Sequence, residues 1–390
     1  MVVRSTPQPA KSLEELDRVH HKGLRICSGT FQTSPVLSLY VDTHQLPLDL
    51  RREELGLRYL TRIKSNAENP SNKVICQLDD SKFGPRSSTP FQIRLNNSVT
   101  DETLKTQNVL EIAPSRIQPW RIPKAKLCQK TIVKKDTSDQ IVKSMFLEHD
   151  ETHGDDYKIY TDGSKSSGGV GFAVVTDDFY DAAKMPHTAS VYTAELSAIN
   201  RVLEVVYHTN KRSFVIYSDS KSVLESLNTY NPSHPLVQKA QEWLFRISSR
   251  HKSLSFCWVP AHVGIPGNEE ADKKAKDICS QREIDVKKIP HFDMKRPIRD
   301  YIFCKWQERW SSPLLVKNKK LKAIRPQISF WQSSFHRDRR IEIMLTRLRI
   351  GNSKLTHSYL LDNSSAPECA HCGSELTIEH ILVHCTRYTN

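Results

Sequence analysis

The stretch Tyr157-Lys158-Ile159-Tyr160-Thr161-Asp162-Gly163-Ser164 opens the strongest fold signal in this chain of 390 residues. Its side chains alternate in character, as in a half-buried strand, and a glycine-bearing turn leads to a second apolar run over 171–175. Residues 179–190 can supply a third strand. The pattern therefore predicts an antiparallel hairpin with a third strand, and it places Asp162 at the C-terminal end of the first.

Helical and strand patterns alternate downstream of this hairpin. The predicted elements are a helix over 193–208, a strand over 214–217, a helix through 223–227, a helix over 232–250, a strand over 254–259 and a helix over 268–278. Strands mixed with helices in this order predict an α/β fold, a mixed five-stranded sheet with flanking helices.

Four carboxylates occupy positions where this fold would gather them: Asp162, Glu195, Asp219 and Asp272. Ligands bind at strand ends in open α/β sheets. Because converging carboxylates repel one another, the set predicts hard divalent cations held by oxygen ligands. Two such ions, about 3.5–4 Å apart, can activate a water and stabilise the leaving oxygen of a phosphodiester. Taken singly, an Asp after a strand is more commonly a turn former or a helix N-cap, so the prediction rests on the set.

Four motifs carry a family resemblance. Tyr160–Ser164, Thr193–Leu196, Ser218–Ser220 and Trp258–Asp272 resemble the motifs of type 1 ribonuclease H, in the version found in non-LTR retrotransposons. The resemblance covers residues 153–281 and implies an endonuclease that hydrolyses the RNA strand of RNA–DNA hybrids to 5′-phosphomonoesters. It implies that the four carboxylates bind two Mg²⁺ ions, bridged by Asp162, with Mn²⁺ as an alternative metal.

The same resemblance implies further roles. His262 would assist proton transfer or product release, and Gly163, Ser164 and Ser220 would contact the hybrid. RNA would be told from DNA through the 2′-OH near Glu195. The alternative function is a catalytically inactive, nucleic-acid-binding remnant of a retroelement. A third class, an interaction module, has no positive feature in the sequence.

The N-terminal flank shows helical spacing over residues 1–66, with Ser12 and Glu15 as a capping box and Gly29 at a helix end. Segments within 16–52 resemble the region after the polymerase palm of jockey-like reverse transcriptases, but the polymerase's Asp-Asp motif is absent. This predicts the C-terminal part of a longer reading frame, or a genomic fragment, that does not synthesise DNA by itself; an unrelated helical bundle is the alternative. Residues 67–152 are predicted to be a mostly irregular linker with a few short strands.

The net charge of +13 is unevenly distributed. Residues 281–350 hold 18 Lys and Arg against 7 Asp and Glu, whereas residues 151–280 hold 14 against 16. We therefore predict a basic helical region over 282–350 that binds nucleic acid; a solvated basic face is the alternative. Aromatic residues among these bases could stack on nucleotides, although the spacing of Tyr301, Ile302 and Trp306 favours a core. The other aromatic residues of this set are Trp310, Phe330, Trp331 and Phe335.

Three of the nine cysteines crowd the C-terminal segment, residues 351–390. Cys369, Cys372, His380 and Cys385 supply the ligands of a closed tetrahedral Zn²⁺ site, and the set resembles the terminal Cys-Cys-His-Cys element of the same retrotransposons. Such an element could clip the segment over Ile378, Ile381 and Leu382 or contact nucleic acid. Free thiols without metal are the alternative, and His371 and His384 are competing ligands.

Composition excludes other classes. The hydrophobic share is 38%, and no run of about 18 apolar residues occurs, so no membrane span or membrane partner is predicted. The first residues lack the apolar core of a signal peptide, and the odd, scattered cysteines do not predict a disulfide framework. We therefore expect an intracellular, reducing location. The sequence does not predict the oligomeric state.

Overall fold

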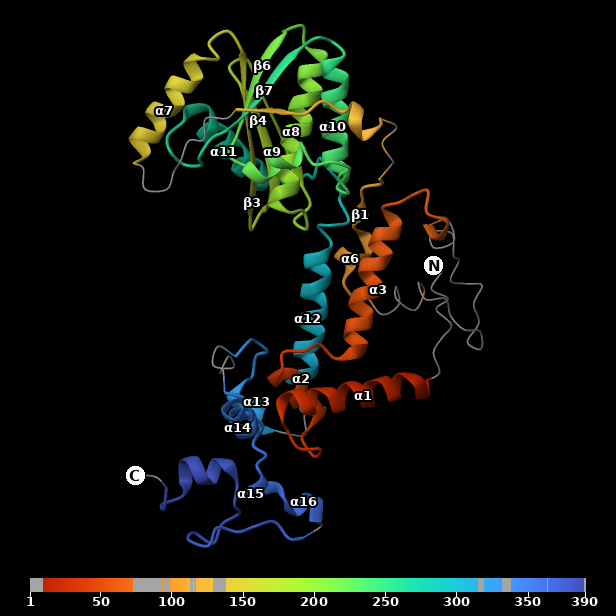
Figure 1. Cartoon of the computed structure of the whole chain (residues 1–390), viewed down its shortest axis with the longest axis vertical. Coiled ribbons are helices and arrows are strands. Elements are labelled where there is room, and N and C mark those ends of the chain that lie inside the picture. The colour runs from red at the N-terminus through yellow and green to blue at the C-terminus, as the bar shows by residue number, and fades with distance from the viewer. Residues whose placement is uncertain are drawn as a thin grey trace. The chain divides into compact units, whose positions relative to one another are not determined.

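The computed structural model describes residues 10–72, 93, 99–112, 115, 117–128, 138–314, 319–331, 338–362 and 364–388 (Figure 1). The chain forms two compact units. The first comprises residues 1–56, 83–95 and 299–390, and the second comprises 57–82 and 96–298.

A mixed sheet is the centre of the second unit, in the order β2-β7-β6-β3-β4-β5. Its strands are β2 (Lys126–Leu127), β3 (Tyr157–Ser166), β4 (Gly169–Thr176), β5 (Tyr180–Met185), β6 (Ser213–Ser218) and β7 (Ser253–Trp258). Strands β3, β4 and β5 are antiparallel, whereas β6 and β7 continue the sheet in parallel. This confirms the predicted α/β class.

The sheet has six strands, not the predicted five, because β2 pairs in parallel with β7. The backbone groups on the outer side of β7 need partners, and a short strand supplies them. A few short strands were predicted within 67–152, but two residues are too few for any periodicity, so the sequence pattern did not locate β2.

Helices cover both faces of the sheet (Figure 1). They are α7 (Asp139–Glu151), α8 (Val191–His208), α9 (Lys221–Ser226), α10 (Pro235–Ser248) and α11 (Pro266–Cys279). A Cβ on Gly163 would meet α8, and one on Gly171 would meet α11. Gly163 of β3 pairs with Phe172 of β4, and Gly171 is the neighbour of Phe172 in β4. Because successive residues of a strand face opposite sides of the sheet, Gly163 and Gly171 face opposite sides. Helices α8 and α11 therefore lie on different faces.

Helix α7 was not predicted, because the whole segment 67–152 was expected to be mostly irregular. Its buried residues Val142 and Phe146 pack against Val215 and Tyr217 of β6, on the α11 face of the sheet. Tertiary burial of two side chains, more than local propensity, explains a helix in a polar context. The segment also contains α6 (Glu102–Thr106), β1 (Asn108–Val109), which pairs with β8 (Lys288–Ile289), and a 3-10 turn over Pro119–Arg121. Residues 73–92 of the predicted linker lie outside the described residues.

The first unit is helical. Its elements include α1 (Ala10–Ser28), α2 (Val36–Asp42), α13 (Lys319–Ile324) and α14 (Arg339–Ile350), and the division between the units falls within α3 (Leu48–Lys64) and α12 (Lys295–Ser311). Helix α1 ends at Ser28 and is followed by Gly29, whose positive φ of 68° fits the predicted helix end. Ser12, however, already lies inside α1 and is not its N-cap.

The C-terminal segment has little regular structure. It contains α15 (Lys354–His357), α16 (Tyr359–Asp362) and a π-helical turn over His380–His384. Upstream, Tyr301, Ile302, Trp306 and Trp310 of α12 are buried, as their spacing predicted for the first three. None of the described helices is long and apolar enough to cross a membrane.

Candidate active site

Strand register brings Asp162 and Asp219 together. The parallel pairing of β3 with β6 ends at Thr161 and Ser218, so each aspartate is the next residue of its strand or loop. Strand β3 itself continues to Ser166 against β4, and Asp162 therefore lies within a strand and not at the strand end that was predicted. The expected position still holds in one respect, because it is the parallel part of the sheet that ends there.

Glu195 reaches the same place from helix α8. The hydroxyl of Ser190 caps that helix by accepting a hydrogen bond from the Thr193 N–H. A Cβ on Gly163 would lie 2.5 Å from the Glu195 nitrogen, so only glycine lets β3 approach the first turn of α8 this closely. Gly163 thereby allows Glu195 to lie beside Asp162, the residue that precedes Gly163 in β3.

The three carboxylates form a buried acidic triad. Oxygens of Asp162, Glu195 and Asp219 all lie within 4.8 Å of one another. Asp162 and Glu195 are each only 5% exposed, and one Glu195 oxygen, Oε2, finds no hydrogen-bond donor among the described residues. Such a group is costly to bury unless a partner of opposite charge approaches it.

Burial and mutual repulsion raise the pKa of each triad member. Burial, with the charges of Asp219 and Asp272 adding to it, raises the pKa of Asp162 to about 7. Burial, and then the charges of Asp162 and Asp219, raise the pKa of Glu195 well above its ordinary value. Burial and Asp272 raise the pKa of Asp219. The triad therefore resists full ionisation without a cation.

Asp272 lies on α11, at the margin of this cluster. It raises the pKa of both Asp162 and Asp219, which places its charge within reach of the triad. Its Oδ2 accepts a hydrogen bond of 2.6 Å from Nζ of Lys276, one helical turn along. Lys276 was not among the predicted site residues, although a lysine four residues after an aspartate on a helix is a recognisable pairing pattern.

His262 lies on the loop before α11, with an exposed side chain and a left-handed backbone (φ 57°). Its Nδ1 is 4.0 Å from Oε2 of Glu269, and ligand atoms of His262, Glu269 and Asp272 lie within 4.8 Å of one another. Glu269 was also missed by the sequence reasoning. Its other oxygen accepts a hydrogen bond from the Gly264 N–H, so it fastens the loop that carries His262.

The residues expected to contact substrate differ in exposure. Gly163 is buried against α8, as described above. Ser164 is half-buried on β3, and Ser220 is half-buried at the N-cap position of α9. The backbone N–H of Ser220 donates to the Ser218 hydroxyl. Ser164 thus lies two residues after Asp162 on β3, and Ser220 directly follows Asp219 after the end of β6.

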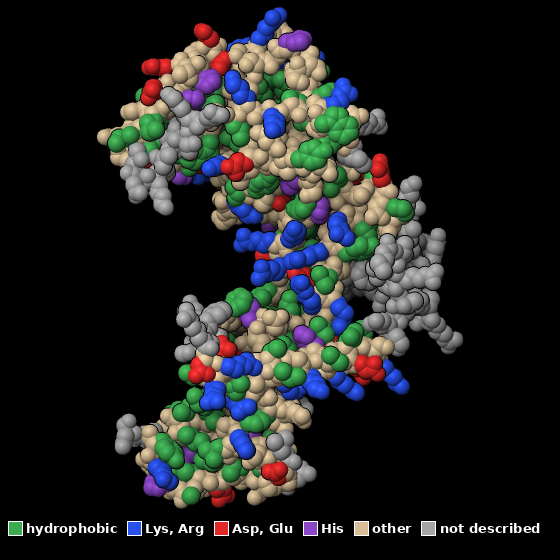
Figure 2. All heavy atoms as spheres, viewed as in Figure 1, with side chains coloured by type: hydrophobic (Ala, Val, Ile, Leu, Met, Phe, Trp, Pro, Cys, Tyr) green, Lys and Arg blue, Asp and Glu red, His purple; other side chains and the backbone are tan. Residues whose placement is uncertain are grey.

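Many cations of the predicted basic region have partners within the protein. Lys and Arg side chains gather over α12 (Figure 2). Contacts of 3.8 Å or less join Lys305 to Glu53, Arg309 to Asp49, Lys322 to the Ser311 carbonyl, Arg347 to the Gly29 carbonyl and Arg349 to Asp42. At these positions the basic side chains serve the packing of the first unit. Lys317, Phe335 and Arg337 lie outside the described residues.

The C-terminal cysteines and histidine converge. Ligand atoms of Cys369, Cys372, His380 and Cys385 lie within 4.8 Å of one another, and the Cys385 sulfur is 3.8 Å from each of the other two. Bonds of about 2.3 Å in a tetrahedral zinc site would separate two sulfurs by about 3.8 Å. Hydrogen bonds from the backbone of Cys372 and His371 lower the pKa of the Cys369 thiol to about 6, which favours the thiolate. The competing residues His371 and His384 are not part of this group.

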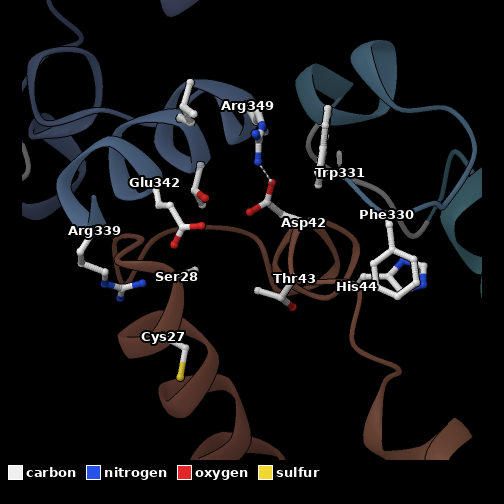
Figure 3. A pocket seen from close by; sticks show the side chains of 12 residues that line it. Cys27, Ser28, Asp42, Thr43, His44, Phe330, Trp331, Arg339, Glu342 and Arg349 are labelled. Carbon is white, nitrogen blue, oxygen red and sulfur yellow. Dashed lines mark ion pairs between the residues drawn. The ribbon is translucent and has the colours of Figure 1, made fainter. Parts of the chain in front are cut away.

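A cavity of about 270 Å³ lies in the first unit, among α1, α2 and α14 (Figure 3). Asp42 faces Arg349 there at 3.8 Å, and burial raises the pKa of Asp42 to about 6 although Arg349 opposes the shift. None of the predicted catalytic or metal-binding residues lines this cavity, although Phe330 and Trp331 of the basic region do. The carboxylate chemistry predicted from the sequence belongs to the second unit alone.

Comparison with known proteins supports the assignment of this region. Residues 154–280 match the family model described as RNase H. The Pol polyprotein of equine infectious anemia virus (strain Wyoming) is 34% identical over 125 residues, which is 30% of this chain and 10% of the polyprotein. The Pol polyprotein of caprine arthritis encephalitis virus (strain Cork) is 28% identical over 126 residues, 32% of this chain and 11% of the polyprotein.

A cellular protein gives a similar result. The ribonuclease H of Tropheryma whipplei (strain Twist) is 35% identical over 98 residues, 22% of this chain and 60% of that protein. By contrast, the match with the two viral Pol polyproteins spans only about a tenth of the length of each polyprotein. Residues 154–280 are a ribonuclease H family domain with a buried acidic triad, and this region is distantly similar to retroviral Pol polyproteins and to bacterial ribonuclease H.

Proposed function

We propose that residues 154–280 hydrolyse the RNA strand of RNA–DNA hybrids endonucleolytically, by two-metal-ion catalysis, and leave 5′-phosphomonoesters. The buried acidic triad, in a domain that matches the ribonuclease H family, carries this proposal. The domain match implies a hybrid substrate, and the triad supplies the charge that such chemistry needs.

The triad fits divalent magnesium. Its donors are all carboxylate oxygens, burial and then mutual repulsion raise the pKa of Asp162 and Glu195, and Glu195 Oε2 is buried with no described donor. A hard dication prefers such oxygen ligands, offsets the repulsion among the carboxylates and gives the buried oxygen a partner. Asp162, Glu195, Asp219 and Asp272 would hold two Mg²⁺ ions, or Mn²⁺ in their place. When bound, the ions supply Lewis-acid stabilisation of the charge that develops on the phosphate.

The protein's own residues then orient the reacting groups. Asp162 is paired with Ala173 of β4 and directly follows the last residue of β3 that pairs with β6, so its backbone has the fixed position that a ligand of both ions would require. Glu195, beside Gly163, would tell RNA from DNA through the 2′-OH of the RNA strand. Ser164 and Ser220, close in the chain to Asp162 and Asp219, would contact the backbone of the hybrid. Exposed His262 can exchange a proton with solvent and with the leaving group, supported by Glu269.

We further propose that the chain belongs to a retroelement protein similar to those of jockey-like non-LTR retrotransposons. The motif resemblance and the identity with viral Pol polyproteins support this origin. In such a protein the C-terminal Cys-Cys-His-Cys cluster would bind Zn²⁺. Lys and Arg side chains of the basic region would bind the hybrid.

The test is a cleavage assay of the full chain. Labelled RNA–DNA hybrid, double-stranded RNA, double-stranded DNA and single-stranded RNA are each incubated with Mg²⁺, Mn²⁺ or EDTA. We expect cleavage of the hybrid's RNA strand alone, internally, with 5′-phosphate ends, and none in EDTA. Binding of the hybrid without cleavage at any metal concentration would reject the proposal in favour of an inactive nucleic-acid-binding remnant.

A further inference from the structure

A second Cys/His cluster lies on the edge of the sheet, away from the acidic triad and from the C-terminal cysteines. Ligand atoms of Cys128, His149, His153 and Cys257 all lie within 4.8 Å of one another. His149 and Cys257 are buried, and Cys128 and His153 are half-buried. Three of the four residues precede the segment that matches the ribonuclease H family, and only Cys257 lies within it.

The fold brings these residues together through two elements, β2 and α7, that the sequence pattern did not locate. Strand β2 pairs with β7, and the Cys128 N–H donates a 2.8 Å hydrogen bond to the Phe256 carbonyl, which places Cys128 beside Cys257. Helix α7 packs through Phe146 in the same hydrophobic cluster that contains Cys257. Its last turn carries His149, and the turn that follows carries His153.

Both imidazoles direct the same nitrogen toward sulfur. Nε2 of His149 is 3.2 Å from the Cys257 sulfur, and Nε2 of His153 is 3.9 Å from the Cys128 sulfur. Nδ1–H of His153 donates to the Asp156 carboxylate at 2.6 Å, which leaves the Nε2 lone pair directed at the cluster. Asp156 is held in turn by the Ser213 hydroxyl. A carboxylate that orients a histidine in this way is the usual outer partner of a zinc ligand.

We propose that Cys128, His149, His153 and Cys257 form a structural Zn²⁺ site. Two thiolates and two imidazoles are the donor set of closed, tetrahedral zinc sites, and their softness disfavours Mg²⁺. The zinc ion would fasten β2 and α7, which precede the ribonuclease H domain, to strand β7 within it. This site is independent of the proposed hydrolysis and of the C-terminal cluster.

The alternative to a metal site is a disulfide bond between Cys128 and Cys257. The structure joins Cys128 and Cys257 by a disulfide, and zinc binding requires a thiol reductant to cleave this bond to two thiols, which then lose their protons on binding the metal. A disulfide does not require two imidazole nitrogens directed at its sulfurs, and it does not require a carboxylate that orients one of these imidazoles. The four-residue geometry therefore favours the metal.

Strand β7 also links this site to the acidic triad. Trp258 follows Cys257, and its Nε1–H donates a 2.8 Å hydrogen bond to the carbonyl of Asp219. Loss of the zinc ion would loosen β7 at the position that supports Asp219. Its removal should therefore weaken the protein locally without removing any ligand of the proposed Mg²⁺ ions.

The test measures metal content, not hydrolysis. The full chain is purified with a thiol reductant, and zinc per chain is determined by mass spectrometry in the double variant Cys372→Ser/Cys385→Ser, which lacks the C-terminal cluster. We expect one zinc per chain in this background. Adding Cys128→Ser or His153→Asn should reduce it to none, whereas the matched control Cys27→Ser, at an exposed free cysteine, should retain it.

Cobalt provides a second readout that does not depend on the folding of those added variants. Co²⁺ added to the metal-free double variant should give the visible bands of a tetrahedral, thiolate-ligated ion at one equivalent, and Zn²⁺ should displace them. Less than a tenth of an equivalent of zinc together with absent cobalt bands would overturn the proposal. A Cys128–Cys257 disulfide peptide found after reduction, in place of bound metal, would also overturn it.

Discussion

The acidic triad and the C-terminal Cys-Cys-His-Cys cluster are both groups of potential metal ligands, but the protein builds them differently. The triad comes from β3, α8 and the end of β6, which surround fully buried side chains such as Ile159, Leu196 and Ile216. The C-terminal cluster lies within residues 369–385, where Ile378 is buried but Leu382 and Val383 are each 60% exposed. One site is imposed by a hydrophobic core, whereas the other has almost no core of its own.

This difference shows what each site needs from a metal. Core packing holds the carboxylates together against their repulsion, so that the fold exists first and the cation relieves a cost. The short Cys/His segment buries too little apolar surface to fold by itself, so metal binding would supply its folding free energy. Variants that remove a ligand should therefore have opposite consequences at the two sites.

The largest effect is expected for Asp162→Asn. It should lower hybrid cleavage more than about 10³-fold, because metal ions supply several kcal/mol of transition-state stabilisation and each 1.4 kcal/mol is tenfold in rate. Hybrid binding should remain nearly intact, since a carboxylate repels phosphate. Single-turnover cleavage and a binding titration measure the two quantities. Cleavage within a few fold of the unmodified protein would remove Asp162 from the site.

His262→Ala should have a smaller effect on the same reaction. A proton shuttle contributes about 10²–10⁴-fold at most, and a role in product release contributes less, while the carboxylates stay in place. We expect slower multiple turnover with the same dependence on Mg²⁺ concentration. His208→Ala, a change on the far end of α8, is the matched control. Activity as low as that of Asp162→Asn would instead make His262 indispensable.

The stability of the metal-free protein should depend on pH through Asp162. Its pKa rises from 3.8 to about 7 on folding, so the folded state keeps a proton that the unfolded state releases near pH 4. The stabilisation is present below pH 4 and is lost as the pH rises to about 7, by up to about 4 kcal/mol at 1.4 kcal/mol per unit. Glu195 and Asp219 act in the same direction.

Thermal melts in EDTA at pH 5 and pH 8 would measure this dependence. The melting temperature of the unmodified protein should be lower at pH 8, Mg²⁺ should restore it, and Asp162→Asn should flatten the profile. Equal profiles for the two proteins would show that the fold does not strain the carboxylate.

The smallest effect on cleavage is expected for Cys372→Ser. Because the cluster and the triad belong to different compact units, hybrid cleavage should stay within about twofold. Hydrogen exchange should nevertheless show loss of protection confined to residues 364–388, and a zinc chelator should produce the same loss in the unmodified protein. Protection that survives both treatments would mean that this segment folds without metal.

Much of the active site could be predicted from the sequence. Asp162, Glu195 and Asp219 each sit in a short motif next to a clear strand or helix pattern, and the structure brings the three together. Lys276 and Glu269 were missed, because their importance depends on which side of α11 and its loop faces the cluster. Strand β2 and helix α7 were missed because their stability comes from partners far along the chain.

The sequence by itself determined the α/β class and the carboxylate and cysteine motifs, because alternation, helical spacing and close ligand spacing are local properties. Only the tertiary structure decided which charges are buried, that Gly163 must be a glycine for Glu195 to approach Asp162, and that Cys128 meets Cys257. These facts depend on strand register and on packing between distant segments. No local pattern contains them, because the burial energy that fixes them is shared across the whole core.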